Sequence, residues 1–285
     1  MSKLSDIGYI KKIMNKHGFE FSKSLGQNFL INPSVCPKIA ELGGAAPGVG
    51  VIEVGAGIGV LTSELASRAD KVVSIELDKR LIPVLEQTLG EYDNIKVVNE
   101  DVLKIDLKSL IESEFAGLDV VVCANLPYYI TSPVIMRLLE EKLPIKSITV
   151  MVQKEAALRL TAKLGTRECG AVTVAVRYFS EPKLLFNVSR GSFMPAPNVD
   201  SSVIRLDIGA QESFAVEDER QFFRVVKAAF GQRRKQLANA LSAGLGITKE
   251  QVGEAMNKAG LRPTARAEEL KMEEFAALAN ALLMF

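Results

Sequence analysis

The chain has 285 residues, with 35 basic and 34 acidic side chains and a formal net charge of +1. That length is sufficient for one large domain and one small one. A charge so close to zero excludes a strong overall positive field as the means of attracting nucleic acid.

The cysteine and histidine content argues against several kinds of site. Cys36, Cys123 and Cys169 are far apart in the sequence and form no C-x-x-C pair, which disfavours a metal centre or a disulfide framework. His17 is the only histidine, so the sequence offers a single candidate for the catalytic base of a Ser-His-Asp or Cys-His mechanism, which disfavours both. The sequence has no secretory signal and no apolar run of about 18 residues. We expect a monomeric, cytoplasmic protein with no metal and no membrane partner.

Hydrophobic periodicity predicts two helices and then a regular alternation of strands and helices. The first two helices are expected over 6–16 and 33–42. Strands are expected near 51–54, 72–76, 95–99, 119–124 and 147–152, and helices near 60–68, 79–89, 106–114, 132–141 and 153–163. This alternation is typical of a doubly wound, mostly parallel sheet.

The rest of the chain changes character twice. Two β-branched runs, 171–179 and 201–208, predict a terminal strand pair that brings the sheet to seven strands with an antiparallel edge. Beyond residue 208, helices are expected over 218–230, 235–242, 248–259 and 267–283. We therefore expect an α/β domain over 1–208 and a small all-α domain over 209–285.

A glycine-rich turn follows the strand expected over 51–54. The run Glu53-Val-Gly55-Ala-Gly57-Ile-Gly59 leads into a helix, and glycines there let the backbone approach a nucleotide-like ligand. A dinucleotide fingerprint would need a third glycine where Val60 stands, and no Walker lysine is present. The E-x-G-x-G-x-G spacing instead resembles the pattern of class I S-adenosylmethionine (AdoMet) methyltransferases.

Acidic residues end the next two expected strands. Glu76 follows the first glycine of the turn by about 20 residues, the usual distance for a carboxylate that binds ribose hydroxyls. Asp101 ends the strand after that. Taken singly, each acid is better explained as a solvated strand end. Beside a glycine turn, the two together indicate a nucleotide-binding edge.

The segment Asn125-Leu126-Pro127-Tyr128 follows the β-branched run of the fourth expected strand. An Asn carboxamide oxygen and a backbone carbonyl can accept the two N–H groups of an exocyclic amine such as adenine N6, which aims the nitrogen lone pair at a methyl donor. Pro127 stiffens the turn, and Tyr128 offers a face on which a base can stack. The alternative is an ordinary strand-to-helix turn with an N-cap Asn.

Five segments along the chain form a recognisable set. They are Ser24-Leu-Gly-Gln27-Asn28-Phe29-Leu30, Glu53-Val-Gly55-Ala-Gly57-Ile-Gly59, Asn125-Leu-Pro-Tyr128, Phe193-Met-Pro195-Ala-Pro197-Asn-Val199-Asp200-Ser201 and Phe230-Gly-Gln-Arg233-Arg234-Lys235. In this order they resemble the small-subunit ribosomal RNA adenine dimethyltransferases, from about residue 10 to the C-terminus. The glycine run is shared by a whole superfamily, whereas the ordered set is specific.

The resemblance implies a cofactor, AdoMet, and the residues that bind it. These are Asn28, Leu30, Gly55, Gly57, Glu76, Asp101 and Asn125. Asn28 and Leu30 would help to enclose AdoMet, and Gly55 would approach its methionine part. Glu76 would hold the ribose hydroxyls and Asp101 the adenine amine.

The resemblance also implies a catalytic group. Its members are Asn125, Leu126, Pro127, Tyr128 and Phe193. Phe193 would clamp an extruded adenine against Tyr128, and stacking on an aromatic ring contributes ~1–3 kcal/mol per base. The alternative for Phe193 is an ordinary core phenylalanine.

Two basic clusters flank the predicted pocket in the sequence. Residues 1–38 carry six lysines and two acids, a net charge of +4, and Lys227 with Arg233, Arg234 and Lys235 forms the second cluster. Such clusters are usually solvated faces. Together with an adenine pocket they predict contacts to RNA phosphates, which fix orientation without distinguishing sequence.

The sequence therefore predicts transfer of methyl groups from AdoMet to adenosine N6 in ribosomal RNA. The resemblance implies dimethylation of two adjacent adenosines in the 3′-terminal hairpin loop of small-subunit rRNA, within a small subunit or its precursor, during subunit maturation. The alternatives are a large-subunit rRNA methyltransferase that confers antibiotic resistance and a non-catalytic RNA-binding factor on the same fold. DNA and protein-glutamine amino-methylases commonly carry proline where Leu126 stands, which disfavours them.

Overall fold

The computed structural model describes residues 4, 6–19, 28–209, 214–232 and 234–285. The chain divides into two compact units. The first contains 1–157 and 182–209, and the second contains 158–181 and 210–285. The second unit therefore includes a segment, 158–181, that the sequence assigned to the first domain, and the chain passes between the units three times.

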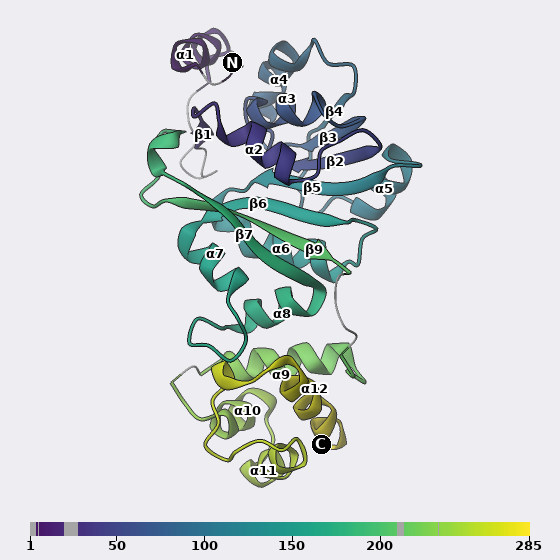
Figure 1. The fold of residues 1–285 in the computed structure, drawn as a ribbon, viewed down its shortest axis with the longest axis vertical. Helices are drawn as coiled ribbons and strands as arrows, with labels where there is room; N and C mark the ends of the chain where they lie inside the picture. The colour runs from purple at the N-terminus through teal and green to yellow at the C-terminus, as the bar shows by residue number, and fades with distance from the viewer. Residues whose placement is uncertain (1–3, 5, 20–27, 210–213, 233) are drawn as a thin grey trace. The chain divides into compact units, whose positions relative to one another are not determined.

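The first unit is built on a seven-stranded sheet in the order β4-β3-β2-β5-β6-β9-β7 (Figure 1). Its strands are β2 (Val49–Val54), β3 (Lys71–Ile75), β4 (Ile95–Val98), β5 (Asp119–Asn125), β6 (Ser147–Gln153), β7 (Ser180–Val188) and β9 (Ser201–Ile208). Strands β2 to β6 pair in parallel, and β9 is antiparallel to β6. The predicted mostly parallel sheet is confirmed. The strand order reverses between β2 and β5, which is where open α/β sheets bind ligands.

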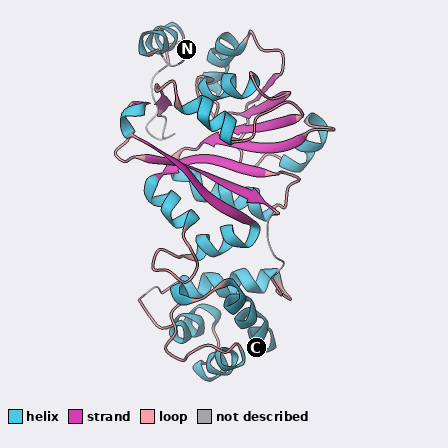
Figure 2. Cartoon of the chain, in the orientation of Figure 1, coloured by secondary structure: helices cyan, strands magenta, loops and turns pink. Residues whose placement is uncertain are grey.

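Helices cover both faces of this sheet (Figure 2). The helices of the first unit that precede β6 are α1 (Ile7–Lys16), α2 (Val35–Leu42), α3 (Val60–Ala66), α4 (Ile82–Leu89), α5 (Leu107–Glu114) and α6 (Thr131–Glu140). Helices α1 to α4 bury their apolar stripes in one cluster with Val51, Val72 and Val121 of the sheet. Because side chains alternate along a strand, the fully buried Ile52 and Val122 face the other side.

A small ribbon joins two distant parts of the first unit. Strand β1 (Phe29–Leu30) pairs antiparallel with β8 (Phe193–Met194), and Leu30 stands opposite Phe193. The ribbon therefore links the segment before the sheet to the segment between β7 and β9.

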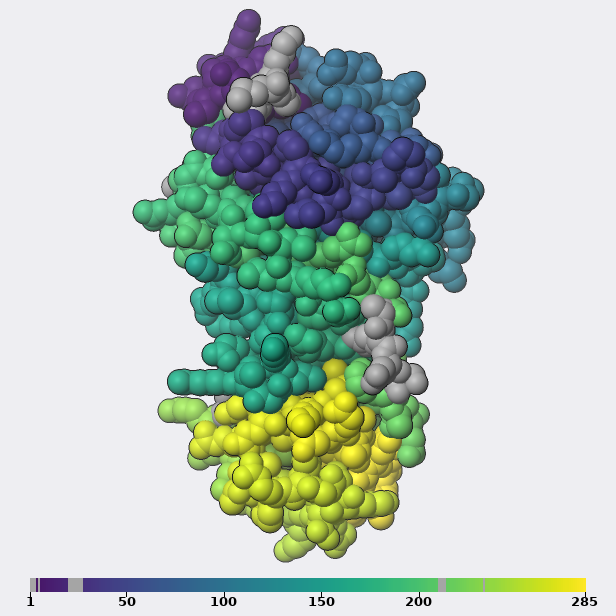
Figure 3. Space-filling model, in the orientation of Figure 1, coloured from purple at the N-terminus to yellow at the C-terminus, as the bar shows by residue number. Residues whose placement is uncertain are grey.

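The second unit is all-helical, as predicted for the C-terminal region. Its helices are α8 (Ala171–Phe179), α9 (Glu219–Phe230), α10 (Leu237–Leu245), α11 (Lys249–Lys258) and α12 (Met272–Ala281), and α7 (Lys154–Thr161) runs across the boundary. Phe222 is fully buried and stacks on Tyr178 of α8, with ring centroids 5.0 Å apart. Helices α9 to α12, the yellow-green part of Figure 3, form a body with its own apolar core.

The interpretation of 171–179 as a strand is wrong, because this segment is helix α8. Thr173 accepts the Gly170 N–H over 3.0 Å and donates to Arg159 O over 2.7 Å, which fixes the first turn of the helix. Val174 is then buried in the apolar core of the second unit. Tertiary packing has overridden the β-propensity of alternating valines. The strand next to β9 is instead β7, an edge strand that contains Pro182.

Candidate active site

Three glycines in the left-handed region form the turn after β2. Gly55, Gly57 and Gly59 have φ angles of 80°, 58° and 90°, values that other residues adopt only with strain. The Gly55 N–H donates to Ile75 O over 2.9 Å, which ties the turn to β3. A Cβ at Gly55 would lie 3.9 Å from Asn125 O. That distance is an ordinary van der Waals contact, so the left-handed backbone, rather than lack of space, favours glycine at this position.

Glu53, just before the turn, is a fully buried carboxyl. Ser74, its register partner on β3, donates to Glu53 Oε2 over 2.6 Å. Burial raises the pKa of Glu53 to about 7, although the hydrogen bond from Ser74 opposes the shift, and the charge of Glu76 adds to it. This carboxyl therefore titrates in the neutral range inside the core.

Glu76 follows β3 and reaches back to the glycine turn. Its Oε2 accepts the Gly57 N–H over 3.0 Å, and its Oε1 accepts the Asp78 N–H over 2.8 Å. Burial raises the pKa of Glu76, and these backbone hydrogen bonds oppose the shift. A carboxylate has about four lone-pair sites, so Glu76 braces two backbone segments and can still accept hydrogen bonds from ligand hydroxyls.

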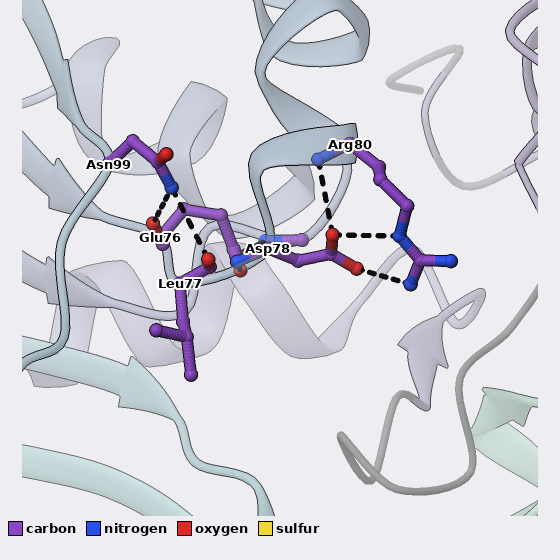
Figure 4. Close-up of polar contacts among 6 residues, drawn as sticks. Glu76, Leu77, Asp78, Arg80 and Asn99 are labelled. Carbon is purple, nitrogen blue, oxygen red and sulfur yellow. Dashed lines mark hydrogen bonds and ion pairs between the residues drawn. The ribbon is translucent and has the colours of Figure 1, made fainter.

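The segment after Glu76 is held in place by its neighbours (Figure 4). Asn99 Nδ2 donates to Glu76 O over 2.8 Å and to Leu77 O over 3.3 Å. Arg80 Nε and Nη2 donate to the Asp78 carboxylate over 2.9 and 2.6 Å. Leu77, which points away from these polar groups, is 50% exposed and presents an apolar surface to the cavity.

Asp101 occupies the corresponding place after β4. Its Oδ1 accepts the Leu103 N–H over 2.9 Å. Arg137 of α6 donates to Val102 O and Ile105 O over 2.5 and 2.6 Å. These contacts fix the loop that brings Asp101 and Val102 to the cavity.

Asn125 ends β5 and begins the tetrapeptide. Its Nδ2 donates to Asn28 O over 3.5 Å, which orients the carboxamide and leaves its oxygen as an acceptor for a ligand. The Leu126 N–H donates to Met151 O of β6 over 3.3 Å. Tyr128 Oη lies 2.8 Å from Ser201 Oγ at the start of β9. The tetrapeptide is thus held by β6, by the start of β9 and by the backbone at Asn28.

One cavity at the carboxyl ends of the parallel strands collects these segments. The predicted site residues that line it are Asn28, Gly55, Gly57, Glu76, Asp101, Asn125, Leu126, Pro127 and Tyr128. The sequence reasoning missed Leu77, Val102 and Tyr129, which line it as well. Leu77 and Val102 each follow a strand-end acid directly, and this position in the sequence could have identified them as cavity residues.

Leu30 and Phe193 are not among the residues that line this cavity. Each is 3% exposed, and they oppose one another on the β1–β8 ribbon. Phe29 and Asn28, beside Leu30 in the chain, do reach the cavity.

The predicted RNA-binding cluster is described in part. Arg233 lies outside the described residues, as do Ser24 to Gln27 of the first motif. Arg234 and Lys235 are exposed after α9, within the second unit. Their role stays a prediction.

Neither a group of three or more potential metal ligands nor a membrane-spanning helix is present in the described part of the chain. No cluster of three or more His, Cys, Asp or Glu side chains there is arranged to hold a metal ion. The three cysteines are buried free thiols, and burial raises the pKa of Cys123 to about 12. Among the described helices, none has the length and apolarity needed to cross a membrane.

The strand order and the cavity define a class: the chain has the Rossmann-like methyltransferase fold. The sequence model of the ribosomal RNA adenine dimethylase family matches residues 18–283, and the chain belongs to that family. Members of the family are AdoMet-dependent methyltransferases, so the protein is an enzyme of this kind.

Individual relatives agree with this assignment. The chain is 50% identical to the ribosomal RNA small subunit methyltransferase A of Geobacillus thermodenitrificans, over 97% of this chain and 96% of the relative. It is also 50% identical to the protein of that name in Alkaliphilus oremlandii, over 99% of each. A solved dimethyladenosine transferase from Plasmodium falciparum superposes with a TM-score of 0.69 at 27% identity, covering 88% of this chain and 95% of that one. The 23S rRNA methyltransferase ErmE superposes with a TM-score of 0.66 at 29% identity, covering 90% and 99%.

Proposed function

We propose that the protein transfers methyl groups from AdoMet, bound in this cavity, to N6 of two adjacent adenosines in the 3′-terminal hairpin loop of small-subunit rRNA. The observation that carries the proposal is the convergence of the glycine turn, Glu76, Asp101 and Asn125 on one cavity. The nearly full-length relatives named as small-subunit methyltransferases support the choice of rRNA.

The hydrogen-bond acceptors and apolar side chains around the cavity fit AdoMet. Glu76 has lone pairs for two ribose hydroxyls, and Asp101 is placed after the neighbouring strand to accept the adenine amine. Leu77 and Val102 supply apolar contact for the flat adenine. The glycine turn, with no side chain at Gly55, lets the methionine part approach the backbone. When bound, AdoMet supplies a methyl group already activated by its sulfonium.

Asn125 would act on the target amine. Its carboxamide oxygen accepts one N–H of adenine N6, and a neighbouring backbone carbonyl accepts the other, so that the nitrogen lone pair points at the methyl carbon. As the new N–C bond forms and the C–S bond breaks, N6 gains positive charge, which these acceptors stabilise. The extra proton then passes to water, and Tyr128 supports the base by stacking.

The partner in this proposal is small-subunit rRNA within a small subunit or its precursor, and the protein acts as a monomer. Arg234 and Lys235, with Arg233, would contact RNA phosphates. The similarity to a 23S rRNA methyltransferase supports the second candidate, a large-subunit target.

Substrate choice is tested directly. The protein is incubated with labelled AdoMet and with under-methylated small subunits, free small-subunit rRNA or large subunits, and the label is mapped. We expect label on two adjacent adenosines of the small-subunit rRNA. Label on large subunits alone would favour the second candidate. Absence of AdoMet binding in calorimetry would indicate a non-catalytic factor.

A further inference from the structure

Tyr128 is held at its far end by a residue from a distant part of the chain. Its Oη lies 2.8 Å from the Oγ of Ser201, 73 residues away in sequence. Ser201 is fully buried, whereas Tyr128 is half-buried and lines the cavity. The contact therefore joins the wall of the cavity to a fixed point in the core.

The sheet topology explains how these two residues meet. Strand β6 is parallel to β5 and antiparallel to β9, so the start of β9 lies at the edge where β5 and β6 end. Ser201, the first residue of β9, pairs with Gln153, the last residue of β6. Tyr128 follows the end of β5 by three residues, which brings its phenol to that edge.

The backbone before Ser201 is anchored twice. Asp200 O accepts the Lys154 N–H over 3.0 Å, and Asp200 Oδ1 accepts the Arg190 N–H over 2.9 Å. Burial raises the pKa of Tyr128, the hydrogen bond with Ser201 opposes this shift, and the charge of Asp200 adds to it by a smaller amount. The phenol therefore stays protonated at neutral pH, and the contact joins two neutral hydroxyls.

A ring that must stack on a base needs a fixed tilt, and a phenylalanine-like ring anchored only at its Cβ can rotate about two bonds. Resting on the function proposed above, we propose that Ser201 is a positioning residue that sets the tilt of the Tyr128 ring for stacking on the target adenine. Ser201 itself touches neither the cofactor nor the base. It acts through Tyr128.

Ser202 provides a matched control. It is also fully buried, and its Oγ donates to Asn187 Oδ1 over 2.7 Å, on the other face of the strand. Ser202→Ala thus removes a buried serine hydroxyl with a comparable hydrogen bond and does not touch the cavity. Any loss common to Ser201→Ala and Ser202→Ala reflects folding alone.

The experiment uses the full-length protein and small subunits reconstituted with rRNA that carries adenosine, or fluorescent 2-aminopurine, at the target position. For Ser201→Ala and for Tyr128→Phe we expect kcat/KM to fall by roughly three- to tenfold, the effect of losing one neutral hydrogen bond. The double variant should lose no more than either single one. Quenching of 2-aminopurine in the complex should weaken in all three variants, whereas their affinity for AdoMet should stay at the wild-type value. Ser202→Ala should have wild-type kcat/KM and wild-type quenching.

Two results would overturn the inference: a loss for Ser201→Ala no greater than for Ser202→Ala, or additive losses in the double variant. If Ser201→Ala does not fold, Tyr128→Phe alone tests the inference. Wild-type kcat/KM and wild-type quenching in Tyr128→Phe would exclude a role for the contact between the two hydroxyls. A wild-type protein that fails to methylate small subunits would instead contradict the proposed function, so the two failures are distinguishable.

Discussion

The two units of the molecule differ in the polar side chains that they bury, because only the first buries carboxyl groups. The first unit buries Glu53, Ser74, Glu76 and Asp78 around the glycine turn. In the described part of the second unit no charged side chain is buried, and its buried polar side chains, Thr173 and Ser180, are neutral hydroxyls that donate to backbone carbonyls. Burying polar groups destabilises a fold unless each is hydrogen-bonded. Oε1 of the buried Glu53 has no hydrogen-bond partner among the described residues, so the first unit bears such a cost next to the glycine turn. The second unit is held by apolar packing and carries its charges outside.

The largest expected effect tests the packing of the second unit. Phe222→Ala removes a fully buried ring from this core and should lower the free energy of unfolding of the unit by about 3–5 kcal/mol. AdoMet affinity of the folded protein should not change, because the cavity residues belong to the first unit. Denaturant unfolding and calorimetry measure the two quantities. A parallel loss of AdoMet affinity would show that the units are not independent.

Asn125→Ala tests the site of the first unit. Loss of the amine acceptor should raise the barrier to methyl transfer by about 2.7–4 kcal/mol, a rate loss of roughly 100- to 1,000-fold, while AdoMet still binds. Single-turnover methylation gives the rate. Asn94→Ala is the control, since Asn94 Nδ2 bonds only backbone carbonyls at Ala66 and Ala69. Equal rates for the two variants would refute the role of Asn125.

The buried Glu53 carboxyl makes stability depend on pH. Its pKa is about 7 in the folded protein, against an ordinary value of 4.5 for a solvated glutamate, so between these values only the unfolded chain is ionised. Stability from this group is complete below pH 4.5 and falls as the pH rises to about 7, by about 3 kcal/mol. Glu53→Gln should remove that decline. Unfolding curves for both proteins at several pH values should converge toward low pH, and parallel curves would contradict the assignment.

Glu76→Ala should act on cofactor binding rather than on rate. Hydrogen bonds to a charged group contribute roughly 1.5–3 kcal/mol, so AdoMet affinity should fall tenfold or more. Glu76→Gln keeps an acceptor oxygen and should give a smaller loss. Isothermal calorimetry measures both, and unchanged affinity in the alanine variant would exclude Glu76 as the ribose ligand.

The smallest effect is expected at the surface of the second unit. Replacing Arg233, Arg234 and Lys235 with Gln should flatten the slope of log RNA affinity against log salt by up to ~2–3 units, because each cation that neutralises a phosphate releases a counterion. AdoMet affinity should stay constant. Binding measured at several salt concentrations tests this, and an unchanged slope would identify the cluster as a solvated face.

The sequence predicts the cavity well because parallel strands bring their carboxyl ends to one edge. Glu76, Asp101 and Asn125 could be placed together from the expected strand ends, the glycine turn and the family resemblance, and the structure has them around one cavity. The structure differs from the sequence interpretation where long-range packing decides. Val174 became helical because it packs with residues of α9 to α12, and β7 was missed because Pro182 and its charged neighbours suit an edge strand.

Leu30 and Phe193 show the same limit within the site itself. Both belong to segments that return to the sheet from far along the chain, and their pairing on the β1–β8 ribbon depends on register. A one-residue shift of register exchanges the two faces of a strand. No local pattern reveals which of Phe29 and Leu30 reaches the cavity.

The division of the second unit into two chain segments bears on synthesis and on truncation. Helix α8 leaves the ribosome before α9 to α12, which complete the apolar core around Val174 and Cys169. During translation the apolar face of α8 is therefore exposed until α9 to α12 have been synthesised. A chain cut after residue 209 would keep that face permanently uncovered, so the helical unit cannot be removed as a simple tail, and such a fragment should be prone to aggregation.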